Sequence, residues 1–233
     1  MNTVSLGDRM KQNYENRSRY YLTRRTPVII RLDGKSFYTF TRGFAKPFDI
    51  KLRTCMIEGI NALIEEVQGF VCAYHQSDEI SICIMDYKEL ESQAWFDYNL
   101  QKLCSVSSSI VTQAFNAQSM VSIGKNDAVF DARAFNIPKE EVYNYFLWRQ
   151  NDWVTNSVSM VAQSLFSHKE LHKKSIADMR VMIKEKDIDY DDYLEYWKYG
   201  TFIMKDTMKQ EYKMINGTHM AKRLNDLVFN TSV

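Results

Sequence analysis

Two groups of carboxylates follow strand-like stretches of this sequence. Asp33 comes near the end of VIIRLDG at residues 28–34, and Asp78 and Glu79 lie in QSDEISICI at residues 76–84. Carboxylate oxygens, together with a backbone carbonyl such as that of Gly34, suit Mg²⁺, and two such ions about 4 Å apart can activate an attacking hydroxyl. Asp-Gly and Ser-Asp-Glu are also ordinary turn sequences, so the spacing alone leaves both interpretations open.

The elements around these carboxylates predict a split βαβ arrangement. The pattern of apolar and β-branched residues predicts strands at 28–32, 70–74, 80–85 and 128–137, and helices at 49–67 and 91–117. This order is that of an α+β, ferredoxin-like βαββαβ core with an antiparallel sheet, in which the first strand and the central hairpin are neighbours. We therefore expect Asp33 and Asp78 to lie side by side at one edge of the sheet.

The rest of the chain is expected to be mainly helical. The pattern predicts helices at 5–22, 139–148, 151–170, 172–185 and 190–198, then a short strand near 200–205 and a final helix. Residues 1–138 would form the catalytic domain, and residues 139–233 a helical region packed on it. The aromatic-rich stretch at 189–200 predicts a docking segment, against either the core or a second subunit.

Composition and charge exclude several classes of protein. No run approaches the roughly 20 apolar residues of a membrane span, and the N-terminus lacks the apolar stretch of a signal peptide, which favours a cytoplasmic protein. The four cysteines form no C-x-x-C pair, so we expect reduced core thiols. The net charge of +1 does not indicate a nucleic-acid binder. The basic segment at 9–25 can follow an RNA backbone or simply be a solvated helix surface.

Four longer motifs resemble the tRNA(His) guanylyltransferase superfamily, polymerases that extend RNA in the 3′→5′ direction. They are RLDGKSFYTFTRGFAKPFD (31–49), AYHQSDEIS (73–81), FDARAF (130–135) and YFLWRQND (145–152), in the family's order and at similar spacing. The resemblance runs over about residues 5–205. It favours the metal-site interpretation and implies a domain like the palm of ordinary polymerases.

The resemblance also implies roles for individual residues. Two Mg²⁺ ions would be held by Asp33, the Gly34 carbonyl and Asp78, with Glu79 as a further catalytic carboxylate that supports the site. ATP or GTP would serve as activating and incoming nucleotides. The implied nucleotide and triphosphate contacts are Arg31, Lys35, Phe44, Ala45, Lys46, Asp49, Ser77, Lys102 and Arg133. The expected RNA contacts are Arg17, Arg19, Arg24, Arg25, Arg149 and Asn156.

Departures from the family's pattern indicate one branch of it. Eukaryotic members follow W-R-Q with A-D-x-H-I-N-N, whereas this chain has NDWVTNS, in which Val154 replaces the histidine. Tyr199 replaces the lysine of R-K-G-T, and DYN at 97–99 replaces a basic stretch. These changes argue against recognition of a histidine anticodon. They fit the shorter guanylyltransferase-like branch of bacteria, archaea and phages, whose members repair 5′-truncated tRNAs.

The implied activity is therefore template-dependent addition of NTPs to the 5′ end of a tRNA by a homotetramer, a dimer of dimers, with no membrane partner. An NTP, usually ATP, would activate the 5′ phosphate, and the 3′-hydroxyl of the incoming NTP would then attack it. Three alternatives stay open: a true tRNA(His) guanylyltransferase adding G at position −1, a palm-fold nucleotide cyclase, and an inactive RNA-binding module. The retained Asp33, Asp78, Glu79 and Lys46 argue against the inactive module.

Overall fold

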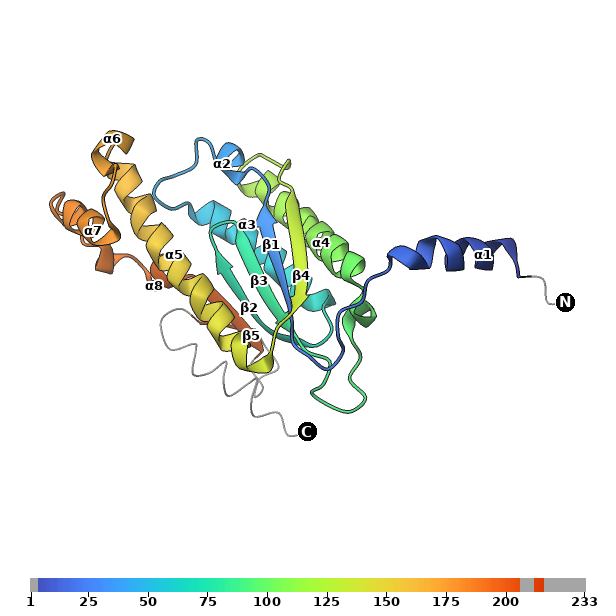
Figure 1. The fold of residues 1–233 in the computed structure, drawn as a ribbon. Coiled ribbons are helices and arrows are strands. Elements are labelled where there is room, and N and C mark those ends of the chain that lie inside the picture. The colour runs from blue at the N-terminus through green and yellow to red at the C-terminus, as the bar shows by residue number, and fades with distance from the viewer. Residues whose placement is uncertain (1–3, 206–211, 216–233) are drawn as a thin grey trace.

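An antiparallel sheet forms the centre of the molecule in the computed structural model, which describes residues 4–205 and the backbone of 212–215 (Figure 1). The strands are β1 (Val28–Gly34), β2 (Phe70–Gln76), β3 (Glu79–Ile84), β4 (Phe130–Asn136), β5 (Thr201–Lys205) and β6 (Tyr212–Ile215). Their order across the sheet is β4-β1-β3-β2-β5-β6. With α3 (Ile50–Glu66) and α4 (Leu100–Ser122), the first four strands form the predicted βαββαβ core, so the fold class is confirmed.

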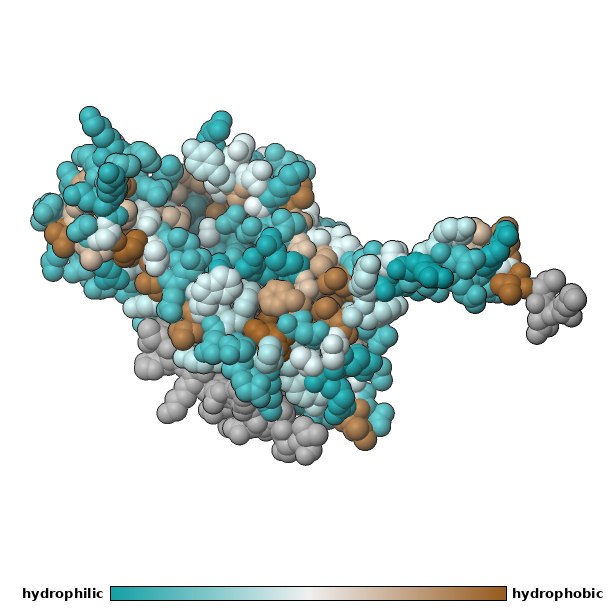
Figure 2. Space-filling model, viewed as in Figure 1, coloured by the Kyte–Doolittle hydropathy of each residue, from teal (hydrophilic) through white to brown (hydrophobic). Residues whose placement is uncertain are grey.

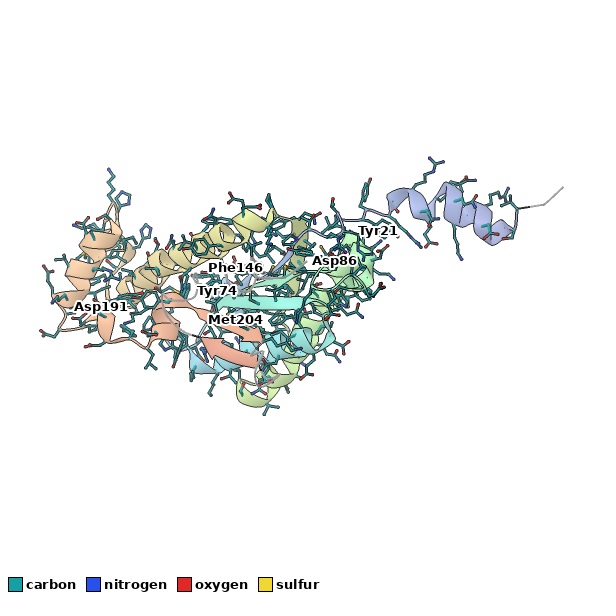
Figure 3. The ribbon with its side chains drawn as sticks, turned by 90° about the horizontal axis from the view of Figure 1, so that it is seen from below. Tyr21, Tyr74, Asp86, Phe146, Asp191 and Met204 are labelled. Atoms are coloured by element: carbon teal, nitrogen blue, oxygen red, sulfur yellow. The ribbon has the colours of Figure 1, made fainter. Side chains whose placement is uncertain are left out.

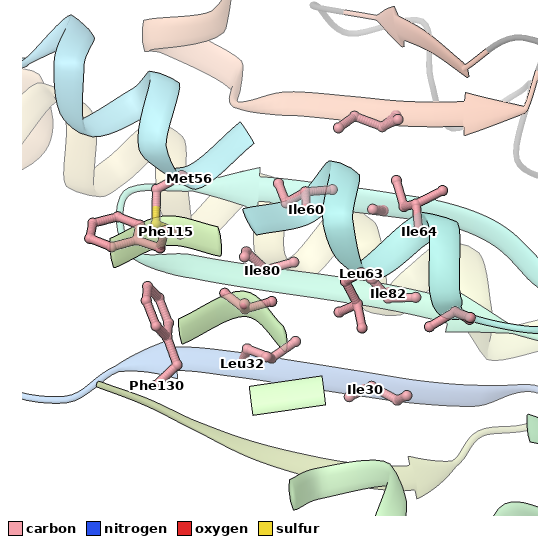
Figure 4. Close-up of a cluster of buried hydrophobic side chains, with 14 of the residues drawn as sticks. Ile30, Leu32, Met56, Ile60, Leu63, Ile64, Ile80, Ile82, Phe115 and Phe130 are labelled. Carbon is pink, nitrogen blue, oxygen red and sulfur yellow. The ribbon is translucent and has the colours of Figure 1, made fainter. Parts of the chain in front are cut away.

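Helices cover both faces of the sheet because alternate residues of its central strands are apolar on both sides. Val28, Ile30 and Leu32 point to the face covered by α3 and α4, where they join the main core (Figure 4). Ile29, between them, points to the opposite face. There the first half of α5 (Val142–Leu165) packs through Val142 and neighbouring aromatic residues.

The helix α5 is continuous where the sequence predicts two helices, at 139–148 and 151–170. This prediction is wrong because the buried face does not break at the polar residues near 150: Arg149, Gln150 and Trp153 are all buried along it. The second half of α5 runs past the sheet and packs against α7 (Ile176–Lys184), which forms a separate apolar cluster. The short helix α6 (His168–Leu171) joins them.

Other element boundaries also differ from the predictions. The N-terminal helix α1 (Leu6–Asn13) is shorter than the predicted 5–22 and is followed by the 3₁₀ turn η1 (Glu15–Ser18). The helix expected from residue 91 begins only at Leu100, because Phe96, Asp97 and Tyr98 have positive φ within the turn η2 (Trp95–Tyr98). The remaining elements are the helices α2 (Phe37–Phe40) and α8 (Glu195–Tyr199) and the 3₁₀ turns η3 (Lys139–Glu141) and η4 (Tyr190–Asp192).

The C-terminal part contributes a strand as well as helices. The strand predicted near 200–205 is β5, and it pairs with β2 of the core. The division at residue 138 stays a prediction, and the predicted final helix lies outside the described residues. All four cysteines are free and three are buried, as expected of reduced core thiols.

The helix α1 projects away from the rest of the chain, and none of its residues is buried (Figures 1 and 2). The segment after it is tied to the domain at Tyr21, which bridges to Asn99, and at Arg24, whose Nε lies 2.5 Å from the buried carboxylate of Asp86 (Figure 3). Among the described residues, no helix combines the length and apolar character that crossing a bilayer requires.

Candidate functional site

The register of the sheet places carboxylates around the end of β1. Asp33 lies across from Glu79 on β3 and from Asp131 on β4, so the three side chains share one face. Asp78 lies in the turn between β2 and β3, and its carbonyl accepts a hydrogen bond of 3.1 Å from the Gly34 N–H. The structure therefore brings Asp33, Gly34 and Asp78 together at one end of the sheet, as the topology predicted.

These carboxylates are in an environment that disfavours their charge. Burial raises the pKa of Asp33, and the nearby charges of Glu79 and Asp131 raise it further. Burial likewise raises the pKa of Asp78, with a smaller contribution from Asp33, while a hydrogen bond to Ser77 acts in the opposite direction. A divalent cation would reverse this electrostatic penalty.

The available ligands are few. Within the described ranges, no group of three or more His, Cys, Asp or Glu side chains is arranged to hold a metal ion. What the sheet end offers is two carboxylates, Asp33 and Asp78, beside the carbonyl of Gly34. That partial set of oxygen ligands fits Mg²⁺, which usually keeps several waters and completes its shell with substrate phosphates.

Glu79 differs from the two aspartates because a buried arginine binds it. Arg149 Nε and Nη2 donate to Glu79 Oε1 and Oε2, each at 2.7 Å, and Arg149 Nη2 lies 3.2 Å from Asp152. Arg149 is only 7% exposed. The predicted RNA contact of Arg149 is therefore not supported: its side chain faces the protein interior, and its donors are engaged by acidic side chains.

A cavity of about 310 Å³ opens next to Asp78. The predicted nucleotide loop, with Phe44, Ala45 and Lys46, forms one wall. The opposite walls come from α5 and α8, and in the space-filling view the surface is hollowed between α5 and α2 (Figure 2). Sequence reasoning missed these distant walls, although the aromatic composition of 189–200 was a signal for them.

Aromatic rings close the cavity on the α8 side. Trp197 stacks on Phe48 with ring centroids 4.8 Å apart and an angle of 6° between the planes. The guanidinium of Arg53, on α3, lies 4.2 Å from the ring centroid of Tyr196. The aromatic-rich segment thus docks within its own chain, which answers the question that the sequence left open.

Asp49 holds the nucleotide loop in shape. Its Oδ1 caps α3 by accepting from the Lys51 and Leu52 N–H groups at 2.8 and 3.2 Å, and its Oδ2 accepts from the Ala45 N–H at 2.9 Å. Both carboxylate oxygens therefore fix the loop backbone, and Lys46 is left exposed on the cavity rim.

Several buried polar atoms around the cavity have no hydrogen-bond partner. They are Arg53 Nε, Gln76 Oε1 and Trp153 Nε1. Unpartnered buried donors and acceptors are costly, so a polar ligand that satisfies them would gain free energy on binding. His75 also lines the cavity, and burial lowers its pKa to about 4, which leaves the ring neutral at pH 7.

The two arginines implied in triphosphate binding lie next to the carboxylates. Arg31 and Arg133 face each other across β1 and β4, two residues from Asp33 and Asp131. Arg133 is exposed and lies 3.4 Å from Asp131, while Arg31 Nε is buried without a partner. Lys35 and Ser77 are exposed at the same end of the sheet, in the segments that follow β1 and β2.

Lys102 does not join this site within one chain. It lies in the first turn of α4, where the Leu100 N–H donates to the Tyr20 carbonyl ahead of β1. Because β3 runs antiparallel to β1, the chain leaves β3 at the end opposite to Asp33, and α4 begins there. The predicted triphosphate contact of Lys102 is therefore not supported.

The expected RNA-binding arginines at 17–25 also lie before β1, at that opposite end. Arg19 is paired with Glu15, and Arg24 with Asp86 and Asp97, whereas Arg17 and Arg25 are exposed. Asn156 is exposed on α5. Their role in RNA binding stays a prediction.

The chain is similar to proteins of known fold and family. The sequence profile of the tRNAHis guanylyltransferase family matches residues 7–138. A solved structure of a bacterial tRNA(His) guanylyltransferase-like protein in complex with ATP has a TM-score of 0.90 and 42% identity, covering 98% of this chain and 99% of the other. One in complex with GTP has a TM-score of 0.81 and 36% identity, covering 99% and 100%.

More distant relatives agree with these matches. An uncharacterized protein of Acanthamoeba polyphaga mimivirus is 27% identical, with 88% of this chain and 79% of the other covered. The tRNA(His) guanylyltransferase of Schizosaccharomyces pombe is 25% identical, with 88% and 83% covered. The Saccharomyces cerevisiae enzyme structure, at 19% identity and a TM-score of 0.74, covers 91% of this chain and 98% of its own and shares the fold.

Proposed function

Because the chain belongs to the tRNAHis guanylyltransferase family, we propose that it is a template-dependent 3′–5′ nucleotidyltransferase that repairs the 5′ ends of truncated tRNAs. The observation that carries this proposal is the pairing of Asp33 and Asp78 at one end of the sheet, beside a cavity lined by unpartnered polar atoms. This arrangement puts a place for cations next to a place for a nucleotide.

Asp33, Asp78 and the Gly34 carbonyl would hold Mg²⁺. When bound, Mg²⁺ lowers the pKa of an attacking hydroxyl and neutralises charge on phosphate oxygens. The fit rests on the chemistry of the donors, which are hard oxygens whose negative charge is disfavoured by burial and by neighbouring carboxylates.

The cavity would bind the activating nucleotide. Structures of bacterial relatives hold ATP or GTP, which is the class of ligand we infer here. The ring pair of Phe48 and Trp197 offers an apolar wall for the base, and Arg53 Nε, Gln76 Oε1 and Trp153 Nε1 offer hydrogen bonds. Lys46 on the rim and Ser77 beside Asp78 would then meet the phosphates.

Arg31 and Arg133 would bind the triphosphate of the incoming nucleotide on the other side of the carboxylates. Guanidinium groups suit this role because their planar donors match phosphate oxygens. Arg31 Nε has no partner in the protein, and it lies on the same face of β1 as Asp33. This would place the two nucleotides on either side of the aspartates.

The residues would act mainly by positioning two in-line displacements. In the first, a 5′-monophosphate oxygen attacks the α-phosphorus of ATP, which yields an adenylylated 5′ end and releases pyrophosphate. In the second, the 3′-hydroxyl of an NTP attacks the 5′ phosphorus and AMP leaves. Holding the reacting groups in line and neutralising phosphate charge supply most of the rate in such reactions.

The tRNA would be selected by base pairing of the incoming nucleotide with its opposite strand. The exposed Arg17, Arg25 and Asn156 remain the candidate backbone contacts, and Arg19 and Arg24 are candidates only where their ion pairs leave donors free. We also propose the family's homotetramer for this chain.

A single assay tests the function. Full-length and 5′-truncated tRNAs, labelled at the 5′ end, are incubated with each NTP and Mg²⁺ and resolved on a gel. We expect truncated tRNAs to be extended only by nucleotides complementary to the opposite strand. A parallel reaction with labelled NTP and no RNA reveals any cyclic nucleotide. Addition of a single G to full-length tRNA(His) alone, a cyclic nucleotide, or no product would each contradict the proposal.

A further inference from the structure

Glu79 is surrounded by donors from the protein, although it lies across from Asp33 and follows Asp78 directly. Its Oε1 accepts from Arg149 Nε at 2.7 Å, Gln76 Nε2 at 3.3 Å and Ser81 Oγ at 3.5 Å, and its Oε2 accepts from Arg149 Nη2 at 2.7 Å. A carboxylate offers about four lone-pair directions. The protein's own donors therefore occupy Oε1, and the Arg149 guanidinium holds both oxygens in a fixed orientation, so Glu79 is less available to a cation than an unpaired carboxylate.

Asp33 has the opposite environment. Among the residues that the structure describes, none donates a hydrogen bond to its carboxylate. Two acidic neighbours, Glu79 and Asp131, raise its pKa, and the more weakly acting Arg133 and Arg31 lower it. Asp33 and Glu79 are cross-strand partners on the same face, and the two hydrogen bonds of 2.7 Å from Arg149 are the shortest contacts that distinguish Glu79 from Asp33.

The ion pair between Arg149 and Glu79 is largely buried and held in place by its neighbours. The Arg149 side chain is 9% exposed and that of Glu79 is 12% exposed, which strengthens their interaction relative to a surface pair. The guanidinium is further fixed by Asp152 at 3.2 Å and by the ring of Trp148, whose centroid lies 4.6 Å away. Its orientation on α5 is thus set from three sides.

We propose that Arg149 is a positioning residue that holds Glu79 out of the cation site, so that Asp33 and Asp78 are the carboxylates left for Mg²⁺. This inference rests on the proposed function. Mg²⁺ is octahedral and needs open positions for waters and substrate phosphates. A third carboxylate swinging in would take one of these positions and bind the cation more tightly, but in a less productive arrangement.

The test measures cation affinity, not turnover. Mn²⁺ serves as the probe, and its binding to the protein without nucleotide or RNA is followed by electron paramagnetic resonance. We expect Arg149→Met to bind Mn²⁺ about tenfold more tightly than the unchanged protein, which corresponds to about 1.4 kcal/mol for one added carboxylate ligand. The double variant Arg149→Met/Glu79→Gln should return to the original affinity, because its side chain at 79 is no longer a carboxylate.

Two further variants keep the test decisive. Arg149→Lys is measured beside Arg149→Met, and it replaces Arg149→Met if that variant does not fold, as judged by circular dichroism. Lysine keeps the positive charge but cannot hold both Glu79 oxygens, so binding should still tighten, to a smaller extent. Unchanged affinity in a folded Arg149→Lys would mean that lost charge, and not a freed Glu79, tightens binding in Arg149→Met, and would overturn the inference. Asp33→Asn should lose Mn²⁺ binding. If the unchanged protein binds no Mn²⁺, both this inference and the proposed metal site fall.

If the unchanged protein binds Mn²⁺ but the folded Arg149 variant shows equal or weaker affinity, only the role of Arg149 is overturned. A merely structural Arg149 would give that result, because loss of stability does not change the affinity of the folded fraction. Tighter binding that persists in the double variant would also overturn it, since Glu79 could not then be the added ligand.

Discussion

The indole of Trp197 stacks on the ring of Phe48, with centroids 4.8 Å apart and the planes nearly parallel. This contact joins α8 to the nucleotide loop and so completes the cavity from a segment almost 150 residues further along the chain. In the proposed function, this stack is the apolar wall of the cavity against which the base of the nucleotide would lie.

Replacing Trp197 by alanine should weaken nucleotide binding. Loss of a stacking surface costs about 1–3 kcal/mol, or roughly 5- to 150-fold in Kd. Titration of ATP into the RNA-free protein measures this. Tyr14→Ala is the matched control, because Tyr14 is an exposed aromatic residue outside the cavity. If both substitutions had equal effects on ATP binding, the cavity would not be the nucleotide site.

Neutralising the paired aspartates should abolish activity and stabilise the metal-free fold. In Asp33→Asn and Asp78→Asn, nucleotide addition should fall by about a hundredfold or more, as expected when electrostatic groups at a reacting centre are lost. The folded-state pKa of each carboxyl is raised, so ionisation destabilises the fold increasingly as the pH rises above the ordinary value of 3.8, and fully above the raised pKa.

The sign of this second effect can be checked by thermal unfolding in a chelator. The Tm of each Asn variant should exceed that of the unchanged protein at pH 7. The difference should shrink as the pH falls through the raised pKa and vanish below the ordinary value of 3.8. A lower Tm at pH 7 for both variants would show that the aspartates stabilise the fold, contrary to their predicted role.

Acid should destabilise the protein partly through His75. Its pKa is lowered to about 4 by burial, from an ordinary value of 6.5, so between these values the unfolded chain binds a proton that the folded chain does not. Stability contributed by the neutral ring is therefore lost as pH falls through this window, by up to about 1.4 kcal/mol per pH unit. Urea unfolding of His75→Gln between pH 7 and pH 4 should show a shallower slope.

The control for that series is His168→Gln, because His168 is exposed on α6. Its slope should match that of the unchanged protein. If the stability of His75→Gln depends on pH as steeply as that of the unchanged protein, the acid sensitivity comes from other groups.

Gly34 should not tolerate a side chain. A Cβ at this position would lie 2.2 Å from an atom of the Phe37 ring, which packs against Phe115 and Phe130 and cannot easily move. Overpacking of this kind costs about 1–3 kcal/mol, so Gly34→Ala should lower the free energy of unfolding by that amount. The Gly34 N–H also donates to the Asp78 carbonyl, so a shift of the backbone at residue 34 should displace Asp78 and lower the activity as well.

The double variant Gly34→Ala/Phe37→Leu tests the steric cause. The smaller side chain makes room, so the double variant should be less destabilised than the sum of its two single variants. Strict additivity would mean that the ring at 37 is not what excludes a side chain at 34.

Local patterns were enough to predict the core and the meeting of its aspartates. β-branched runs such as VIIRL predict strands from short-range propensity alone, and the order of elements then restricts the topology to few choices. Once β1 and the hairpin are neighbours, the ends of their strands coincide. The juxtaposition of Asp33 and Asp78 follows from that connectivity, with no need to know any side-chain packing.

Contacts between distant segments depended on packing and were not readable from the chain. The pairing of Glu79 with Arg149, the ring stack of Phe48 with Trp197 and the position of Lys102 each depend on where α4, α5 and α8 settle against the sheet. Helix length, register and rotation are decided by which apolar faces fit together across the whole molecule. That fit depends on side chains from distant parts of the chain at once. Only the tertiary structure could therefore show which carboxylate is free to bind a cation and which is held by an arginine.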